Sequence, residues 1–145
     1  MADIHPQLVK DCIYLGRFPL CHLLLSNDSH YPWFILVPDR EGIREIYQLP
    51  DPDRSQLLKE SCDFSAFLQR HYAPDKLNVA ALGNQVPQLH LHHIARFETD
   101  AAWPTPIWGK LPVTPYTVDE LEATRQAVDS AQLEDFESAR DYPQA

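Results

Sequence analysis

The residues of this chain best suited to chemistry are three histidines that fall within four positions of the run 88–94, which reads Gln-Leu-His-Leu-His-His-Ile. Side chains alternate between two faces along a β-strand, so a strand here places Gln88, His90 and His92 on one face. The leucines between them then point to the other face, into a core. An imidazole is nucleophilic when neutral and pairs with anionic oxygens when charged. This face therefore suits phosphate chemistry or metal binding.

The elements that must position these histidines are predicted from hydrophobic spacing and from turn residues. Proline and polar residues separate short apolar runs, which indicates antiparallel strands, and only one long segment has helical spacing. The expected elements in chain order are a hairpin of strands at 13–18 and 20–26, a strand at 33–38, a helix at 51–72, strands at 77–82 and 87–97, and a final helix after Thr117. This order predicts an α+β fold with an antiparallel sheet of about five strands.

The segment 51–72 carries the clearest helical signal. Asp51 is suited to cap the helix, Pro52 suits its first position, and Pro74 follows its expected end. The final helix begins with a capping box formed by Thr117 and Glu120. We therefore divide the chain into one folded domain at 1–116 and an acidic helical tail at 117–145.

Composition and charge narrow the class of protein. The chain has 145 residues, 44% of them hydrophobic, and lacks an uninterrupted apolar run long enough to span a membrane. Its start has neither the basic residues nor the apolar run of a signal peptide. Three cysteines without CxxC spacing indicate a reducing compartment, so we expect a cytoplasmic protein. The net charge of −9, of which −6 lies in the tail, repels DNA and RNA, so no nucleic-acid partner is expected.

The histidine run resembles the signature of the histidine triad (HIT) family, His-φ-His-φ-His-φ-φ, in which φ is apolar. The resemblance extends upstream through Asn78, Gly83 and Asn84, and further back to Asn27 and the strand at 34–38. It covers about residues 13–110, with the tail outside it. It implies a HIT-like sheet with one long helix, to which the tail adds a helical appendage.

The resemblance also implies a homodimeric enzyme that hydrolyses or transfers nucleoside monophosphates. The middle histidine of the motif, here His90, attacks the α-phosphorus and forms a covalent nucleotidyl-histidine. The third, here His92, contacts phosphate oxygens. Dinucleoside polyphosphates, nucleoside phosphoramidates and aminoacyl adenylates are all substrates in the family. No metal or other cofactor is implied.

Further positions match nucleotide contacts of the family. Asn27 matches the residue that holds the ribose, and Asn84 replaces a glutamine beside the phosphate. Gln85 falls where some members place a hydroxyl near the leaving group, and Asn78 matches another polar contact after a one-residue gap. Gln88 departs from the pattern, because it replaces the first histidine and an amide cannot transfer a proton.

The sequence alone also allows other roles for these residues. Gln88 keeps a non-catalytic nucleotide-binding module possible, and His90 with His92 suits a zinc site or a solvent-facing pair on an edge strand. His93 faces with the leucines, which favours a core or dimer-interface position. Trp108 is expected to pack, or to reach the partner subunit's site as a C-terminal segment can in the family. His5 has no spacing partner, so we expect it on the surface.

Overall fold

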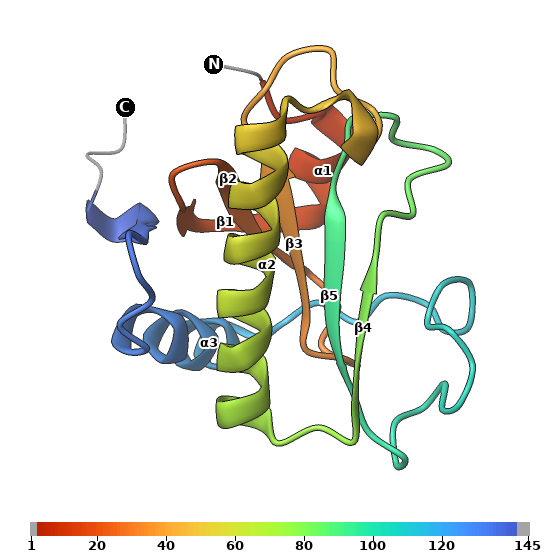
Figure 1. Cartoon of the computed structure of the whole chain (residues 1–145). Coiled ribbons are helices and arrows are strands. Elements are labelled where there is room, and N and C mark those ends of the chain that lie inside the picture. The colour runs from red at the N-terminus through yellow and green to blue at the C-terminus, as the bar shows by residue number, and fades with distance from the viewer. Residues whose placement is uncertain (1–2, 142–145) are drawn as a thin grey trace.

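The computed structural model of the protein describes residues 3–141, so residues 1–2 of the predicted domain and 142–145 of the predicted tail lie outside the described residues. A six-stranded antiparallel sheet in the order β4-β5-β3-β2-β1-β6 forms its centre (Figure 1). The strands are β1 (Cys12–Arg17), β2 (Cys21–Ser26), β3 (Trp33–Pro38), β4 (Lys76–Ala80), β5 (Leu91–Arg96) and β6 (Glu137–Ser138). The helices are α1 (Pro6–Asp11), α2 (Asp51–Tyr72) and α3 (Val118–Ser130), with 3-10 turns at Ile46–Gln48 and Ala139–Asp141. The predicted α+β fold is confirmed.

Helix α2 covers one face of the sheet, where its apolar side chains meet those of the central strands (Figure 1). Phe64 of α2 packs edge-on against Phe34 of β3, with ring centroids 5.0 Å apart. The predicted bounds 51–72 are confirmed, but Pro50, not Asp51, is the N-cap, and no side chain caps this end. Ala73 adopts a left-handed conformation after the last turn, and its N–H bonds to the carbonyl of Gln69, which ends the helix.

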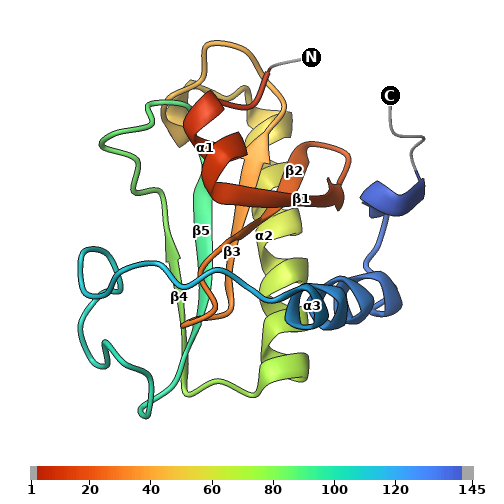
Figure 2. The same ribbon diagram turned by 180° about the vertical axis from the view of Figure 1, so that it is seen from behind.

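The opposite face of the sheet is covered by α1 and by the long connection that leads from β5 to α3 (Figure 2). Leu8 of α1 packs with Ile35, Val37 and Val86, while Ile107 packs with Ile94 of β5. Because side chains alternate along β5, Ile94 and His92 lie on this face, whereas Leu91 and His93 face α2. The histidine run therefore meets the covering segments and not α2.

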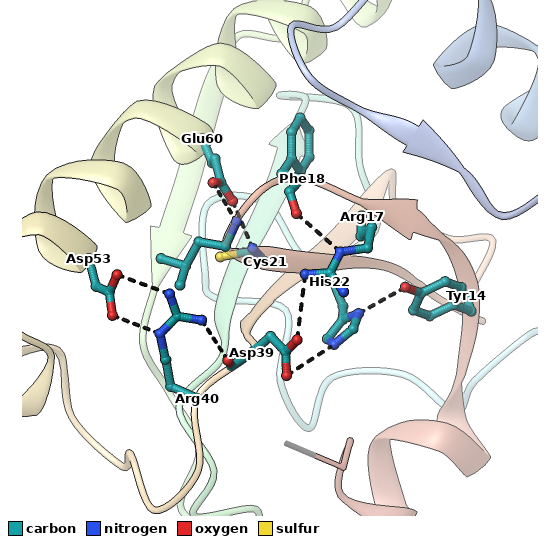
Figure 3. Close-up of polar contacts among 10 residues, drawn as sticks. Tyr14, Arg17, Phe18, Cys21, His22, Asp39, Arg40, Asp53 and Glu60 are labelled. Atoms are coloured by element: carbon teal, nitrogen blue, oxygen red, sulfur yellow. Dashed lines mark hydrogen bonds and ion pairs between the residues drawn. The ribbon is translucent and has the colours of Figure 1, made fainter. Parts of the chain in front are cut away.

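Polar contacts join α2 to the turn between β1 and β2 and to the segment that follows β3 (Figure 3). The carboxylate of Glu60 on α2 accepts hydrogen bonds from the backbone N–H groups of Leu20 and Cys21, at 2.9 and 2.8 Å. Arg40, which follows β3, forms a two-bond ion pair with Asp53 of α2 at 2.8 and 3.1 Å. These contacts fix the turn of the hairpin and the start of the segment after β3.

The tail packs on the domain rather than apart from it. Val128 of α3 is 1% exposed and belongs to the main core, and β6 pairs with β1. The sheet has six strands instead of about five because the tail supplies this two-residue strand. Gly16 makes the pairing possible, since a Cβ there would lie 2.3 Å from the carbonyl oxygen of Glu137. The domain boundary at residue 116 stays a prediction.

Among residues 3–141, no helix is long and apolar enough to cross a membrane.

Candidate active site

The two candidate histidines lie side by side on an interior strand. β5 runs between β4 and β3, and it begins at Leu91, so the expected strand at 87–97 is shorter than predicted. His90 immediately precedes it, and the rings of His90 and His92 have centroids 4.9 Å apart. They are 4% and 5% exposed, so the interpretation as a solvent-facing pair on an edge strand is wrong. The leucines beside them lie in the core, as expected.

One ring nitrogen of His90 is held by the backbone. Its Nδ1 donates a hydrogen bond of 2.7 Å to the main-chain carbonyl of Gln88. The proton of the neutral ring is therefore on Nδ1, and Nε2 carries a free lone pair. Among residues 3–141, Nε2 has no hydrogen-bond partner. Burial lowers the pKa of His90, and the bond to Gln88 opposes this only in part, so the neutral form prevails near pH 7.

Both ring nitrogens of His92 are engaged within the protein. Its Nδ1 accepts a hydrogen bond of 3.0 Å from the indole N–H of Trp33, and its Nε2 donates one of 2.7 Å to the carbonyl of Leu82. Burial lowers the pKa of His92 to about 4, so the ring is neutral near pH 7. His92 thus connects β5 to β3 and to the loop between β4 and β5.

A hollow of about 440 Å³ opens in front of these histidines. The indoles of Trp33 and Trp108 flank His92, with ring centroids 5.8 and 5.1 Å from the imidazole. Gly83 packs directly on His90, since a Cβ there would lie 2.6 Å from the ring carbon Cε1. The wall also holds the predicted ligands Asn84 and Gln85, together with Gln7 and Asp11 of α1. Apolar walls with a few polar groups are typical of small-molecule sites.

Two predicted nucleotide ligands lie outside this hollow. The side-chain oxygen of Asn27 accepts a hydrogen bond of 2.9 Å from the backbone N–H of Tyr116, although its neighbour Ser26 lines the hollow. The side-chain oxygen of Asn78 accepts one of 2.8 Å from Arg96, the buried last residue of β5. In this structure both amides hold the fold together.

Gln88 faces the N-terminal segment instead of the hollow. Its Oε1 accepts a hydrogen bond of 2.8 Å from the backbone N–H of His5, and its Nε2 donates one of 2.9 Å to the carbonyl of Asp3. His5 is half-buried, so it is less exposed than the surface position expected for it. No sequence signal could reveal this contact, because the partners are separated by more than 80 residues.

His93 occupies the core, which decides between its two predicted positions. Its Nε2 lies 2.7 Å from the hydroxyl of Ser61 on α2, and its Nδ1 lies 3.1 Å from the carbonyl of Leu91. It is fully buried, and burial lowers its pKa to about 4. His93 is a structural residue that joins β5 to α2.

The HIT domain family matches residues 7–99, which is more than half of the chain. The chain belongs to the HIT family. Members of this family are mostly nucleotide hydrolases and transferases. None of the curated proteins compared is similar enough in sequence to count as a relative.

Solved structures of bacterial histidine triad proteins resemble this HIT protein over most of their length. The one from Marinobacter aquaeolei is 48% identical, with a TM-score of 0.89 over 92% of this chain and 97% of that protein. The proteins from Bradyrhizobium japonicum and Sinorhizobium meliloti are 41% and 37% identical, with TM-scores of 0.86 and 0.85. Each match covers 88% of this chain and 95% or 94% of the other. This coverage leaves too few residues unmatched to hold the whole tail 117–145, so part of it is shared.

Proposed function

We propose that this HIT protein binds a nucleotide in the 440 Å³ hollow and hydrolyses or transfers it through a covalent nucleotidyl-His90. The observation that carries the proposal is the state of the His90 ring. Its Nδ1 proton is fixed on the carbonyl of Gln88, which leaves the lone pair of Nε2 available for attack. Substrates of this chemistry are nucleoside phosphates bonded at the α-phosphorus to a phosphate, an amine or a carboxylate.

In the first step, Nε2 of His90 forms a bond to the α-phosphorus as the bond to the leaving group breaks. Water or another acceptor then displaces the nucleotide from the imidazole. Phosphoryl transfer depends mostly on positioning and on donors around the phosphorus oxygens. Asn84 and the backbone amides after Gly83 line the hollow beside His90 and are placed to donate. Trp33 and Trp108, which flank His92, add apolar ring surfaces to the same hollow.

Nucleotide binding tests the proposal directly. A ligand at about a hundred times its Kd stabilises the folded state by about 2.7 kcal/mol, which raises Tm by several degrees. We therefore expect AMP or GMP to raise the Tm measured by differential scanning fluorimetry, and a nucleoside phosphoramidate to be hydrolysed. Binding without turnover would favour a non-catalytic nucleotide-binding module. A rise with zinc alone, and none with nucleotides, would contradict the proposal in favour of a metal site.

The contacts of His92 support a role in positioning and not in charge stabilisation. A glutamine at this position can accept from the indole of Trp33 and donate to the carbonyl of Leu82, but it can never carry a positive charge. We expect His92→Gln to keep kcat/KM within about tenfold, whereas His92→Leu, which leaves both partners unpaired, loses about a hundredfold. Steady-state kinetics with one phosphoramidate substrate measures both. Equal, large losses in the two variants would instead favour a direct contact between His92 and the phosphate, as the family resemblance implies.

We also propose a homodimer in which two sheets join at β4. This strand lies at one end of the sheet order, and no strand of the described residues lies beyond it. Its Val79 is 48% exposed, and an uncovered strand edge is available for pairing with another copy. Sedimentation equilibrium at micromolar concentration should give twice the chain mass of 16.7 kDa. Val79→Asp should weaken the dimer, whereas Leu58→Asp, at a more exposed site on α2, should not; a monomeric wild type would end the claim.

A further inference from the structure

Gln88 joins the N-terminal segment to the nucleophile. Its side-chain amide exchanges two hydrogen bonds with the main chain of Asp3 and His5, as a neighbouring strand would. Its main-chain carbonyl accepts the Nδ1 proton of His90. One residue therefore positions both imidazoles, although they lie 85 positions apart in the sequence.

The ring of His5 is fixed with a donor directed away from the helix that it caps. Its Nδ1 accepts a hydrogen bond of 3.0 Å from the backbone N–H of Gln7, as the N-cap of α1. An accepting nitrogen bears no proton, so the neutral ring carries its proton on Nε2. Within the part of the chain that the structure describes, this Nε2–H has no protein acceptor. It is a half-buried donor with the capacity to bind a ligand.

Two adjoining hollows lead from His5 to His90. The larger, of about 330 Å³, is lined by His5 and Gln88 on one side and by the segment 40–44 on the other. The smaller, of about 90 Å³, is polar and shares Gln88 and Arg44 with the first, and it ends on Gly83 and His90. Gln88 and Arg44 line both hollows, so the space beside His5 continues to the space beside His90.

We propose that His5 is a catalytic residue whose Nε2–H donates a hydrogen bond to the leaving atom of the substrate. The inference rests on the proposed function. As Nε2 of His90 bonds to the phosphorus, the bond to the leaving nitrogen or oxygen breaks, and its electron pair stays on that atom. A fixed donor stabilises the charge that develops there, and a water molecule delivers a proton to the leaving atom as its bond to phosphorus breaks, because an alkyl amine cannot depart as an anion. Gln88, at the position of the first triad histidine, would then supply this donor indirectly, by holding His5.

The charges in the hollow beside His5 indicate which leaving groups the site accepts. Arg40 is already paired with Asp53 and with the main chain of Asp39, so it is not free to bind phosphates (Figure 3). Glu41 and Asp3 line the same hollow and offset the charge of Arg44. A hollow with two carboxylates, the guanidinium of Arg44 and the N–H donor of His5 suits a polar amine or alcohol better than a polyphosphate. Such leaving atoms need the stabilisation that His5 offers.

The test compares two substrates that differ only in their leaving group. A 4-nitrophenyl ester of AMP departs without help, whereas an adenosine 5′-phosphoramidate of an alkyl amine requires it. His5→Ser retains an N-cap oxygen for Gln7 but has no ring. We expect the ratio of kcat/KM for the amine substrate to that for the nitrophenyl substrate to fall about tenfold or more in His5→Ser. Gln88→Leu should lower the same ratio, because it releases the N-terminal segment.

His71→Ser is the matched control, because His71 is an exposed histidine on α2 far from the hollows, and it should leave the ratio unchanged. An equal loss on both substrates in His5→Ser, or no loss on either, would overturn the role of His5. A wild-type protein that cleaves neither substrate would instead refute the proposed function, because the nitrophenyl ester requires only attack by His90. Thermal melting of each variant shows whether the fold is retained, so that loss of structure is not mistaken for loss of the donor.

Discussion

His90→Asn is expected to abolish turnover while nucleotide affinity stays within about tenfold, or about 1.4 kcal/mol. The asparagine amide can keep the hydrogen bond to the carbonyl of Gln88, so the site should retain its shape. It has no nitrogen lone pair for attack on phosphorus, and removal of a nucleophile costs about 10⁴-fold or more in kcat. Single-turnover kinetics and titration calorimetry measure the two quantities separately.

Detection of the covalent intermediate is a second, independent measurement on the same variant. Rapid quench and mass spectrometry should find the nucleotide on the wild-type peptide that contains His90, and should find none in His90→Asn. His71→Asn should behave as the wild type, because this side chain lies on the exposed side of α2. Undiminished hydrolysis by His90→Asn would refute the covalent mechanism outright.

The largest expected effect on stability comes from Arg96. Its guanidinium forms a two-bond ion pair with Asp100 at 2.8 and 3.1 Å, and it donates to Asn78 and to the carbonyl of Thr105. The two charged side chains are only 2% and 6% exposed. Arg96→Leu leaves a buried carboxylate without its cation, which costs about 3–5 kcal/mol of unfolding free energy. Urea titration measures this loss; Arg54→Leu, which removes an exposed ion pair with Asp51, should cost at most about 1 kcal/mol.

The loss in Arg96→Leu should also depend on pH. Burial raises the pKa of Asp100, but the hydrogen bonds from Arg96 and from backbone N–H groups outweigh this effect, so the net pKa is lowered. A lowered carboxyl pKa stabilises the fold above the pKa of about 3.9 of the unfolded chain, and the contribution disappears as pH falls through the folded value. The difference between wild type and variant should therefore shrink below pH 4. A difference that is small at pH 7, or that grows in acid, would contradict the account.

The elements of the fold were predictable where the signal is local. Pro52 and Pro74, with helical spacing between them, give the bounds of α2, and the alternation around His90 and His92 correctly separates them from the leucines of the core. The strand β6 was missed because two polar residues carry no period. The early part of the expected strand 87–97 fails because Leu89 bonds its N–H to the carbonyl of Ile43, outside the sheet.

The sequence predicted the types of residue at the site, but it predicted much less well where their side chains point. Asn78 was predicted as a ligand, yet a buried guanidinium takes its oxygen. Gln88 was predicted to face with the histidines, yet its amide pairs with main-chain groups at the start of the chain. His5 was missed for the same reason. Contacts between distant segments depend on the assembled tertiary structure, and the sequence has no local pattern for them.

The residue that position 16 tolerates depends on the tail, although this position lies outside it. The backbone of Gly16 adopts a φ of +149°, and a Cβ there would collide with the carbonyl of Glu137 and with the ring of Phe136. Every other amino acid at position 16 would force β6 off the edge of the sheet and uncover Phe18, whose ring packs at a tilt against that of Phe136. In a saturation library or an evolving lineage, tolerance at position 16 should therefore appear only together with loss of the tail. A substitution at position 16 and a deletion of the tail, more than a hundred residues away, should then be found together.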